Sequence, residues 1–258
     1  MDAKLYNDMP SVTRYEKKVC LVTGGTMGIG FSIARRLGLE GANVIICSRK
    51  ENNVKHAESE LKKEGIKCDG ITCNVNDKEA RGKLLENINK KYGRLDVLIC
   101  NVAVNPYFGI SHEISEKEFD KIFEVNVKNT FFTIKESLPL LKNSKNSNIL
   151  IISSFVGYVP MNYIGVYAMS KTVLLSMTKL LAQELAKFDI RVNCIAPGII
   201  RTKFSKAIED SDEAKLNFMQ RSGDPKEIAG AAAYLCSKEA SFVTGETLCI
   251  TGGTFGRL

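Results

Sequence analysis

The sequence contains no run of about 20 apolar residues, the length that a helix needs to cross a bilayer. Residues 1–18 are polar and lack the apolar segment of a secretory signal. Only two histidines, His56 and His112, occur, and they lie far apart in a chain that has no Cys-x-x-Cys pattern. We therefore expect no membrane-spanning segment, no secretion and no metal site.

A basic stripe is also missing. The chain has 36 lysines and arginines against 29 aspartates and glutamates, a formal net charge of +7, but the basic residues are scattered. Nucleic-acid-binding proteins gather such residues on one face, often between aromatic side chains. We therefore expect no nucleic-acid partner.

The eight cysteines do not suggest disulfides. Five of them, Cys20, Cys47, Cys100, Cys194 and Cys249, lie inside apolar runs, where cysteine behaves as a small buried hydrophobic residue. This use of cysteine predicts reduced thiols and an intracellular compartment.

Short apolar runs alternate with longer helical patterns along the chain, and no linker rich in proline or serine divides them. Runs that are apolar almost throughout are typical of strands covered on both faces. The predicted strands span residues 18–23, 43–47, 67–73, 95–100, 148–154, 190–196 and 247–251. Repeated strand–helix units with right-handed crossovers predict an α/β fold, a doubly wound Rossmann fold with a seven-stranded parallel sheet and helices on both faces. We expect one domain over residues 1–258.

Several segments of this domain have their own signals. The helix pattern after Asp77 closes at Gly93, and longer helical patterns cover 116–142 and 167–187. Residues 1–16 are expected to form a polar N-terminal extension. The irregular stretch 197–224 follows the sixth strand, at the sheet edge where ligands bind in such folds, so we expect a substrate-side loop. Its length fits either a lid or a plain surface insertion.

Glycines gather directly after the first predicted strand, in "VCLVTGGTMGIG". Such glycines permit a tight turn and a close approach of the backbone to a pyrophosphate, and the N-terminus of the following helix offers free N–H groups. The position between the first strand and the first helix is the context that a dinucleotide-binding loop requires. The sequence therefore predicts a dinucleotide site here.

The end of the second predicted strand indicates which dinucleotide binds. An NAD site usually has an aspartate or glutamate there, which binds the ribose 2′-hydroxyl. This chain has Ser48, Arg49 and Lys50 instead. A hydroxyl and a guanidinium bind a 2′-phosphate well, and a carboxylate would repel it. The stretch predicts NADPH/NADP+ as the cofactor.

Tyr167 and Lys171 are four residues apart on a predicted helix and therefore share one face. Ser154 ends a predicted strand at the same sheet edge. A proton donor to a carbonyl works best with a pKa near the working pH, and a phenol has a pKa of about 10. A cation at ~4 Å, with an effective dielectric constant of ~20, supplies about the 4 kcal/mol that a shift of three units needs. We therefore expect Lys171 to lower the pKa of Tyr167.

The glycine spacing departs from G-x-G-x-x-G and reads T-G-x-x-x-G-I-G from Thr23 onward. With Tyr-x-x-x-Lys, "FEVNVKN", "CNVAV" and "APGIIRT", it resembles the short-chain dehydrogenase/reductase family, from residue 17 to the end. The resemblance implies that Ser154, Tyr167 and Lys171 are catalytic. It also implies that Asn126 is a fourth catalytic residue, which holds a water between the lysine and solvent.

The resemblance assigns further roles by position. Asn74 stands where an aspartate often contacts adenine, and Ile199 would lie with its neighbours against the nicotinamide. The implied cofactor-binding residues are Thr23, Gly24, Thr26, Met27, Gly28, Ile29, Gly30, Ser48, Arg49, Lys50, Asn74, Val75, Asn101, Val102, Ala103, Tyr167, Lys171, Pro197, Gly198, Ile200 and Thr202. The implied substrate-side residues are Ser154, Val156, Tyr158, Ile164 and Phe204, with Tyr107 and Phe108.

The segments "NVAVNPYFG", "APGIIRTKFS" and "VTGETLCITGGT" are similar to a group of NADPH-dependent carbonyl reductases within the family. This similarity implies hydride transfer to a small-molecule substrate: a ketone, an α-dicarbonyl, a quinone-like aromatic carbonyl or retinal. It also implies a homotetramer, with subunit contacts on the helices at 116–142 and 167–187.

Other assignments remain open. An acyl-carrier ketoreductase or an alcohol dehydrogenase of the same family would share every motif above. A non-catalytic nucleotide-sensing module could use the same fold, although it could dispense with Tyr167 or Lys171. The final residues, Gly256, Arg257 and Leu258, resemble a peroxisomal tripeptide, so we expect a cytoplasmic or peroxisomal location.

Overall fold

The structure is a computed structural model that describes residues 13–206 and 216–254. The C-terminal tripeptide, most of the expected N-terminal extension and the middle of the 197–224 loop lie outside the described residues.

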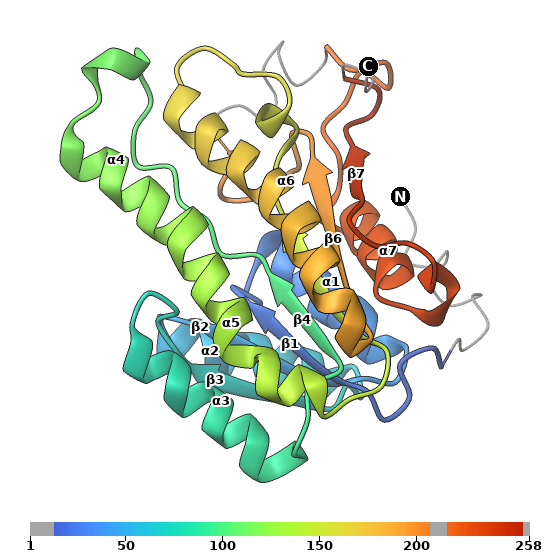
Figure 1. Ribbon diagram of the computed structural model, residues 1–258. Helices are drawn as coiled ribbons and strands as arrows, with labels where there is room; N and C mark the ends of the chain where they lie inside the picture. Colours follow the sequence, from blue (N-terminus) through green and yellow to red (C-terminus); the bar gives the residue numbers. More distant parts are fainter. Residues whose placement is uncertain (1–12, 207–215, 255–258) are drawn as a thin grey trace.

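A seven-stranded sheet forms the centre of the fold (Figure 1). Its strand order is β3-β2-β1-β4-β5-β6-β7, and every neighbouring pair is parallel. The strands are β1 (Val19–Thr23), β2 (Asn43–Ser48), β3 (Cys68–Thr72), β4 (Val97–Cys100), β5 (Ser147–Ile152), β6 (Ile190–Pro197) and β7 (Thr247–Ile250). The strand order reverses between β1 and β4, which leaves a crevice at their carboxyl ends. The predicted doubly wound fold is confirmed.

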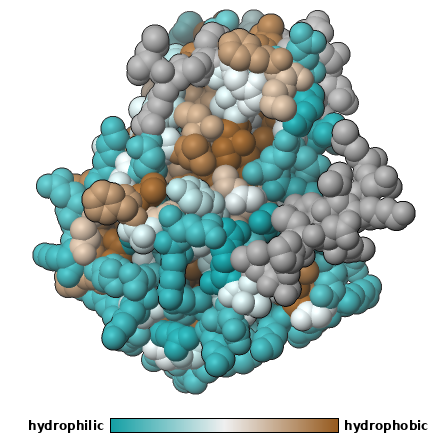
Figure 2. Space-filling view, turned by 90° about the vertical axis from the view of Figure 1, so that its right-hand side faces the viewer, coloured by the Kyte–Doolittle hydropathy of each residue, from teal (hydrophilic) through white to brown (hydrophobic). Residues whose placement is uncertain are grey.

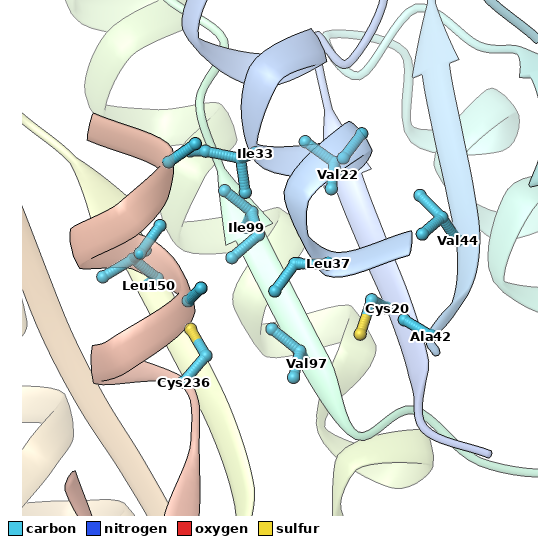
Figure 3. Packing of buried hydrophobic residues seen from close by; sticks show 14 of the residues in the cluster. Cys20, Val22, Ile33, Leu37, Ala42, Val44, Val97, Ile99, Leu150 and Cys236 are labelled. Carbon is cyan, nitrogen blue, oxygen red and sulfur yellow. The ribbon is translucent and has the colours of Figure 1, made fainter. Parts of the chain in front are cut away.

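Helices cover both faces of the sheet. One face carries α1 (Gly28–Leu39), α2 (Glu51–Lys63) and α7 (Pro225–Leu235), and the other carries α3 (Lys78–Tyr92), α5 (Asn129–Lys142) and α6 (Gly165–Leu185). Alternate residues of a strand point to opposite faces, so β1, β2, β4, β5 and β6 each contribute buried residues to two clusters. In β1, Cys20 and Val22 pack with α1, whereas Val19 and Leu21 pack on the other side. Figure 3 shows Ile33 and Leu37 of α1 over Val22 and Ile99.

The local signals for α3 act as the sequence predicts. The side chain of Asp77 accepts hydrogen bonds from the N–H groups of Glu79 and Ala80, and Gly93 ends the helix with a left-handed φ of 67°. Both residues satisfy backbone groups that a helix end leaves without partners.

Two predicted boundaries near the site were wrong. β5 ends at Ile152, and Ser154 instead begins a short 3₁₀ helix, Phe155–Gly157. The expected continuous helix 116–142 consists of α4 (Glu116–Phe123), a π-helical turn (Glu124–Lys128) and α5. Apolar spacing indicates a helix over this stretch but does not give the hydrogen-bond pattern of each turn, so it does not distinguish a π-helical turn from an α-helical one.

On its α7 and β7 side, the molecule is mostly hydrophilic, with apolar side chains gathered in the upper part of the view (Figure 2). Tyr234 of α7 and Leu248 of β7 are among the exposed apolar residues of these elements. Of the five cysteines expected to be buried, four are, whereas Cys249 on β7 is only partly buried. None of the helices in residues 13–206 and 216–254 combines the length and apolar character needed to cross a membrane.

Candidate active site

The carboxyl ends of the strands border a cavity of about 1340 Å³. The loops after β1, β2, β4, β5 and β6 line it, together with the start of α6. This is where an open α/β sheet binds its ligands, and the cavity is somewhat larger than pockets for ordinary small molecules. Its position and size fit a dinucleotide with a substrate beside it.

The glycine loop between β1 and α1 has the backbone that only glycine adopts easily. Gly24 and Gly28 have φ values of 64° and 56°. A Cβ added at Gly30 would collide with the carbonyl oxygen of Gly24 and lie 2.5 Å from Nδ2 of Asn101. The N-cap residue of α1, Met27, caps no N–H with its side chain, so the first turn offers its donors toward the cavity. The loop therefore fits a pyrophosphate.

Asn101 and Thr23 hold this loop to the end of β4. Nδ2 of Asn101 donates hydrogen bonds to the carbonyl oxygens of Thr23 and Gly24, each at 3.2 Å. Oγ1 of Thr23 donates to the carbonyl of Ile99 at 3.0 Å and accepts from the N–H of Asn101 at 3.1 Å. Thr23 and Gly30 do not line the cavity, so they support the loop from behind.

Ser48, Arg49 and Lys50 line the other end of the cavity, at the end of β2. Asn53, from the first turn of α2, lies with them. Among the described residues, Arg49 and Lys50 form no ion pair, and no carboxylate lines this cavity. This end of the cavity can take a phosphate group.

The three expected catalytic side chains come together at the cavity. Ser154, Tyr167 and Lys171 all line it, and the side chain of Ser154 hydrogen-bonds with Tyr167. Tyr167 lies in the first turn of α6, and Lys171 follows one turn later. Nζ of Lys171 donates a hydrogen bond to the carbonyl of Ile152 at 3.0 Å and lies 5.5 Å from the centre of the Tyr167 ring.

Burial dominates the protonation of this pair. Tyr167 is 9% exposed and Lys171 is 2% exposed. Burial raises the pKa of Tyr167, and the hydrogen bond with Ser154 acts in the opposite direction. Burial also lowers the pKa of Lys171 to about 8. The expectation that Lys171 lowers the pKa of Tyr167 was wrong for this structure, because desolvation of the phenol outweighs the other influences and the lysine nitrogen turns to Ile152.

Asn126 lies in the π-helical turn and is fully buried. Its Oδ1 accepts from the N–H of Val104 at 2.8 Å, and its Nδ2 donates to the carbonyl of Val104 and to Oγ of Ser170, each at 3.0 Å. Oγ of Ser170 donates in turn to the carbonyl of Tyr167 at 2.6 Å. Asn126 does not line the cavity, although its neighbour Val125 does. It therefore connects the loop after β4 with the first turns of α6.

The substrate-side wall is apolar. Val156, Ile164 and Phe204 line it as expected, and the ring of Phe204 lies 5.9 Å from that of Tyr167. The expected residues Tyr158 and Tyr107 do not line the cavity.

A second aromatic pair borders this wall. Phe108, which lines the cavity, stacks on Tyr163 with ring centres 5.4 Å apart. Tyr163 has a φ of 65°, and its carbonyl accepts from the N–H of Gly109 at 2.9 Å. This hydrogen bond ties the loop after β4 to the segment before α6.

Most of the residues expected to bind the cofactor line the cavity. They are Gly24, Thr26, Met27, Gly28, Ile29, Ser48, Arg49, Lys50, Asn74, Val75, Asn101, Val102, Ala103, Tyr167, Lys171, Pro197, Gly198, Ile200 and Thr202, and Ile199 lies among them.

Sequence reasoning missed several residues of the cavity. Asn105, Arg201 and Lys203 line it, and Oδ1 of Asn105 is buried with no hydrogen-bond partner among the described residues. "NVAV" and "APGIIRT" flank or contain these positions, so their place near the motifs was the available signal. Within the described residues, no group of three or more histidine, cysteine, aspartate or glutamate side chains could hold a metal ion.

Comparisons with known proteins agree with this geometry. Residues 24–254 match a family model described as "Enoyl-(Acyl carrier protein) reductase". The chain is 44% identical over 248 residues to "Dehydrogenase/reductase SDR family member 4" of Bos taurus, which covers 94% of this chain and 89% of that protein. It is 42% identical over 247 residues to the Homo sapiens protein of the same name, with coverage of 93% and 88%.

A plant protein and a solved structure are also similar. "Tropinone reductase-like 3" of Erythroxylum coca is 42% identical over 250 residues, with coverage of 95% of this chain and 96% of that protein. A structure described as "Crystal structure of gox2181" superposes with a TM-score of 0.89 at 24% identity, covering 94% of this chain and 97% of that one. At that identity, the structural likeness concerns the fold alone.

Proposed function

This chain belongs to the short-chain dehydrogenase/reductase family, a family of oxidoreductases, and from that premise we propose that it is an NADPH-dependent carbonyl reductase. Its substrates would be ketones, α-dicarbonyls or quinone-like aromatic carbonyls, and retinal is a further candidate. The observation that carries the proposal is the convergence of Ser154, Tyr167 and Lys171 on one cavity with the glycine loop.

The choice of NADPH over NADH rests on the end of β2. Arg49 and Lys50 line the cavity there without an ion pair to any described residue, and Ser48 adds a hydroxyl. Charge-assisted hydrogen bonds of this kind favour the ribose 2′-phosphate. The glycine loop and the free N–H groups of α1 would hold the pyrophosphate.

The residues of this chain then handle the carbonyl oxygen. When bound, the reduced nicotinamide supplies a hydride for the carbonyl carbon. Ser154 donates a hydrogen bond to the carbonyl oxygen and orients it toward Tyr167. Because burial raises the pKa of Tyr167, its hydroxyl keeps its proton at neutral pH and gives it to the oxygen as negative charge develops.

Lys171 and Asn126 would support this proton transfer. The pKa of Lys171, lowered by burial to about 8, lies close enough to neutral pH for the amine to exchange protons. It would also contact the nicotinamide ribose. Asn126, through Ser170, fixes the turn of α6 that carries Tyr167 and would position a water between Lys171 and solvent.

A direct assay tests the proposal. Oxidation of NADPH, followed by absorbance with 1-phenyl-1,2-propanedione as substrate, should be fast, and NADH should support much less turnover. Equal kcat/KM values with NADPH and NADH would remove the cofactor assignment.

An acyl-carrier ketoreductase is the second candidate, because the matching family model carries an acyl-carrier reductase in its description. A substrate panel that includes an acetoacetyl thioester and a secondary alcohol with NADP+ separates these activities and the alcohol dehydrogenase alternative. A nucleotide-sensing module would bind NADPH and turn over none of these substrates.

We also propose a homotetramer. Phe131 of α5 and Met169, Val173 and Leu180 of α6 are exposed apolar residues on the helices expected to make subunit contacts. Light scattering should report four subunits, and a monomer would contradict this assembly.

The location is proposed to be cytoplasmic or peroxisomal. Gly256, Arg257 and Leu258 would act as the peroxisomal signal, and they lie outside the described residues. A fluorescent protein fused to the N-terminus, with and without these three residues, distinguishes the two locations.

A further inference from the structure

Among the described residues, the charged side chains that line the cavity all have one sign. Five of them are cationic and none is a carboxylate: Arg49, Lys50, Lys171, Arg201 and Lys203. The proposed function uses the first three of these residues. Arg201 and Lys203 remain without an assigned role.

Both remaining cations lie on the loop after β6, beside groups that face the cofactor and the substrate. Between them stands Thr202, whose methyl carbon would lie 3.1 Å from a Cβ added at Gly28. Directly after them comes Phe204, whose ring lies 5.9 Å from that of the proton donor Tyr167. The two cations therefore sit between the glycine loop and the substrate-side wall.

The structure holds this loop in place. The N–H of Arg201 donates to the carbonyl of Gly223 at 2.9 Å, and Ile200 forms a parallel bridge with Gly223. The side chain of Ser205, which is buried, bonds to the carbonyl of Ile200 and to Oγ1 of Thr202. Because the backbone on both sides of Arg201 is fixed, its position at the cavity is a property of the fold.

The charges of Arg201 and Lys203 are not used within the described residues, where neither forms an ion pair. The carboxylate that Arg201 influences is Glu227, at the start of α7. Glu227 is already engaged by Arg221 in two hydrogen bonds of 2.7 and 2.8 Å. Two exposed cations that line the cavity, with no ion-pair partner in the described part of the chain, can attract an anion.

We propose that Arg201 and Lys203 bind an anionic group of the carbonyl substrate, so that the enzyme prefers compounds whose apolar body carries a carboxylate or phosphate over their neutral analogues. This inference rests on the proposed carbonyl reductase function and specifies its substrate class. The apolar wall at Ile164 and Phe204 would hold the body of the molecule, and the two cations would hold the charged end. The same anion chemistry occurs in the cofactor pyrophosphate, so the experiment separates these two sources.

The test compares benzil-4-carboxylate with its methyl ester, which differs only in charge and one methyl group. The wild type should reduce the acid with a kcat/KM about tenfold above that of the ester, since charge-assisted bonds are the strong kind. Added salt should reduce this ratio, because exposed charges are screened. In the double variant Arg201→Gln/Lys203→Gln, the ratio should fall to that set by the apolar wall alone, close to one.

Controls make each outcome decisive. Lys206→Gln removes an exposed lysine of the same segment that does not line the cavity, and it should keep the wild-type ratio. Equal kcat/KM for acid and ester in the wild type overturns the inference while carbonyl reduction stands. A raised KM for NADPH in the double variant, with the acid-to-ester ratio unchanged, assigns the cations to the cofactor and also overturns it. No turnover of either compound removes the proposed function itself, and the inference with it.

Discussion

Lys171 lies one turn after Tyr167 on α6, with its ammonium nitrogen 5.5 Å from the centre of the tyrosine ring and hydrogen-bonded to the carbonyl of Ile152. Both side chains are buried, so the ammonium group and the phenol lose most of their hydration when the protein folds. This loss of hydration disfavours the charged form of Lys171 and lowers its pKa to about 8.

We expect the stability of the protein to depend on pH through Lys171. Below pH 8 the folded and unfolded states both carry the charge, so the folded state bears the full cost of burying it. Between the folded pKa of about 8 and the ordinary value of 10.5, the unfolded state binds more protons, and stability rises with pH. The difference between these two pKa values corresponds to a rise of about 3 kcal/mol in the free energy of unfolding.

The variant Lys171→Met should remove this rise. Urea unfolding of the wild type and the variant at several pH values gives the difference in unfolding free energy. The advantage of the variant should shrink as the pH increases from about 8 to 10.5. Lys179→Met, which removes an exposed lysine from the same helix, is the matched control. A difference that stays constant over this range would contradict the account of Lys171.

The glycine loop makes a second prediction. Gly30→Ala should weaken NADPH binding about tenfold or more, because its Cβ would collide with the Gly24 carbonyl and force the loop to move. Fluorescence titration with NADPH measures the effect, and circular dichroism checks the fold. Gly82→Ala, in the exposed middle of α3 with no atom within 4 Å of the added Cβ, should leave binding unchanged and stabilise the helix by roughly 0.5–1 kcal/mol. Wild-type affinity in Gly30→Ala would show that the loop does not hold the cofactor.

A third prediction concerns the preference for NADPH over NADH. Arg49→Asp should raise the KM for NADPH about 10- to 100-fold, because it replaces a charge-assisted hydrogen bond with a repulsion. The KM for NADH should stay the same or fall. Lys238→Asp makes a similar change of charge at an exposed site away from the cavity and serves as the control. If Arg49→Asp leaves both KM values unaltered, the 2′-phosphate lies elsewhere.

The fold could be predicted because its signals are local and repeated. A few neighbouring residues suffice to predict these elements: the apolar run predicts β1, and the cap residues Asp77 and Gly93 predict the two ends of α3. The boundaries near the site could not be predicted in the same way. Ser154 sits beyond the end of β5, at the start of a 3₁₀ turn that packs against α6. A Cβ added at Gly157 of this turn would lie 3.0 Å from the backbone carbonyl carbon of Lys171, so the close packing depends on a contact between distant parts of the chain.

In the candidate site too, some features follow from local spacing and others depend on burial or on contacts between distant residues. Tyr167 and Lys171 share a helix, so four residues of spacing suffice to place them together. The protonation of the pair depends on burial, which sequence spacing does not give, and so the expected direction for Tyr167 was wrong. Arg201 lies inside a recognised motif, yet its place on the cavity wall depends on a bridge to Gly223, a contact between distant parts of the chain.

A variant that lacks the hydroxyl of Tyr167 tests most directly whether this group protonates the substrate. In Tyr167→Phe, kcat for the reduction of 1-phenyl-1,2-propanedione should fall about 10²- to 10⁴-fold, the usual contribution of a positioned acid. NADPH should still bind with wild-type affinity, because the glycine loop and Arg49 are intact, and Tyr234→Phe on α7 should behave as the wild type. Turnover by Tyr167→Phe at the wild-type rate would contradict the assignment of this phenol as the proton donor.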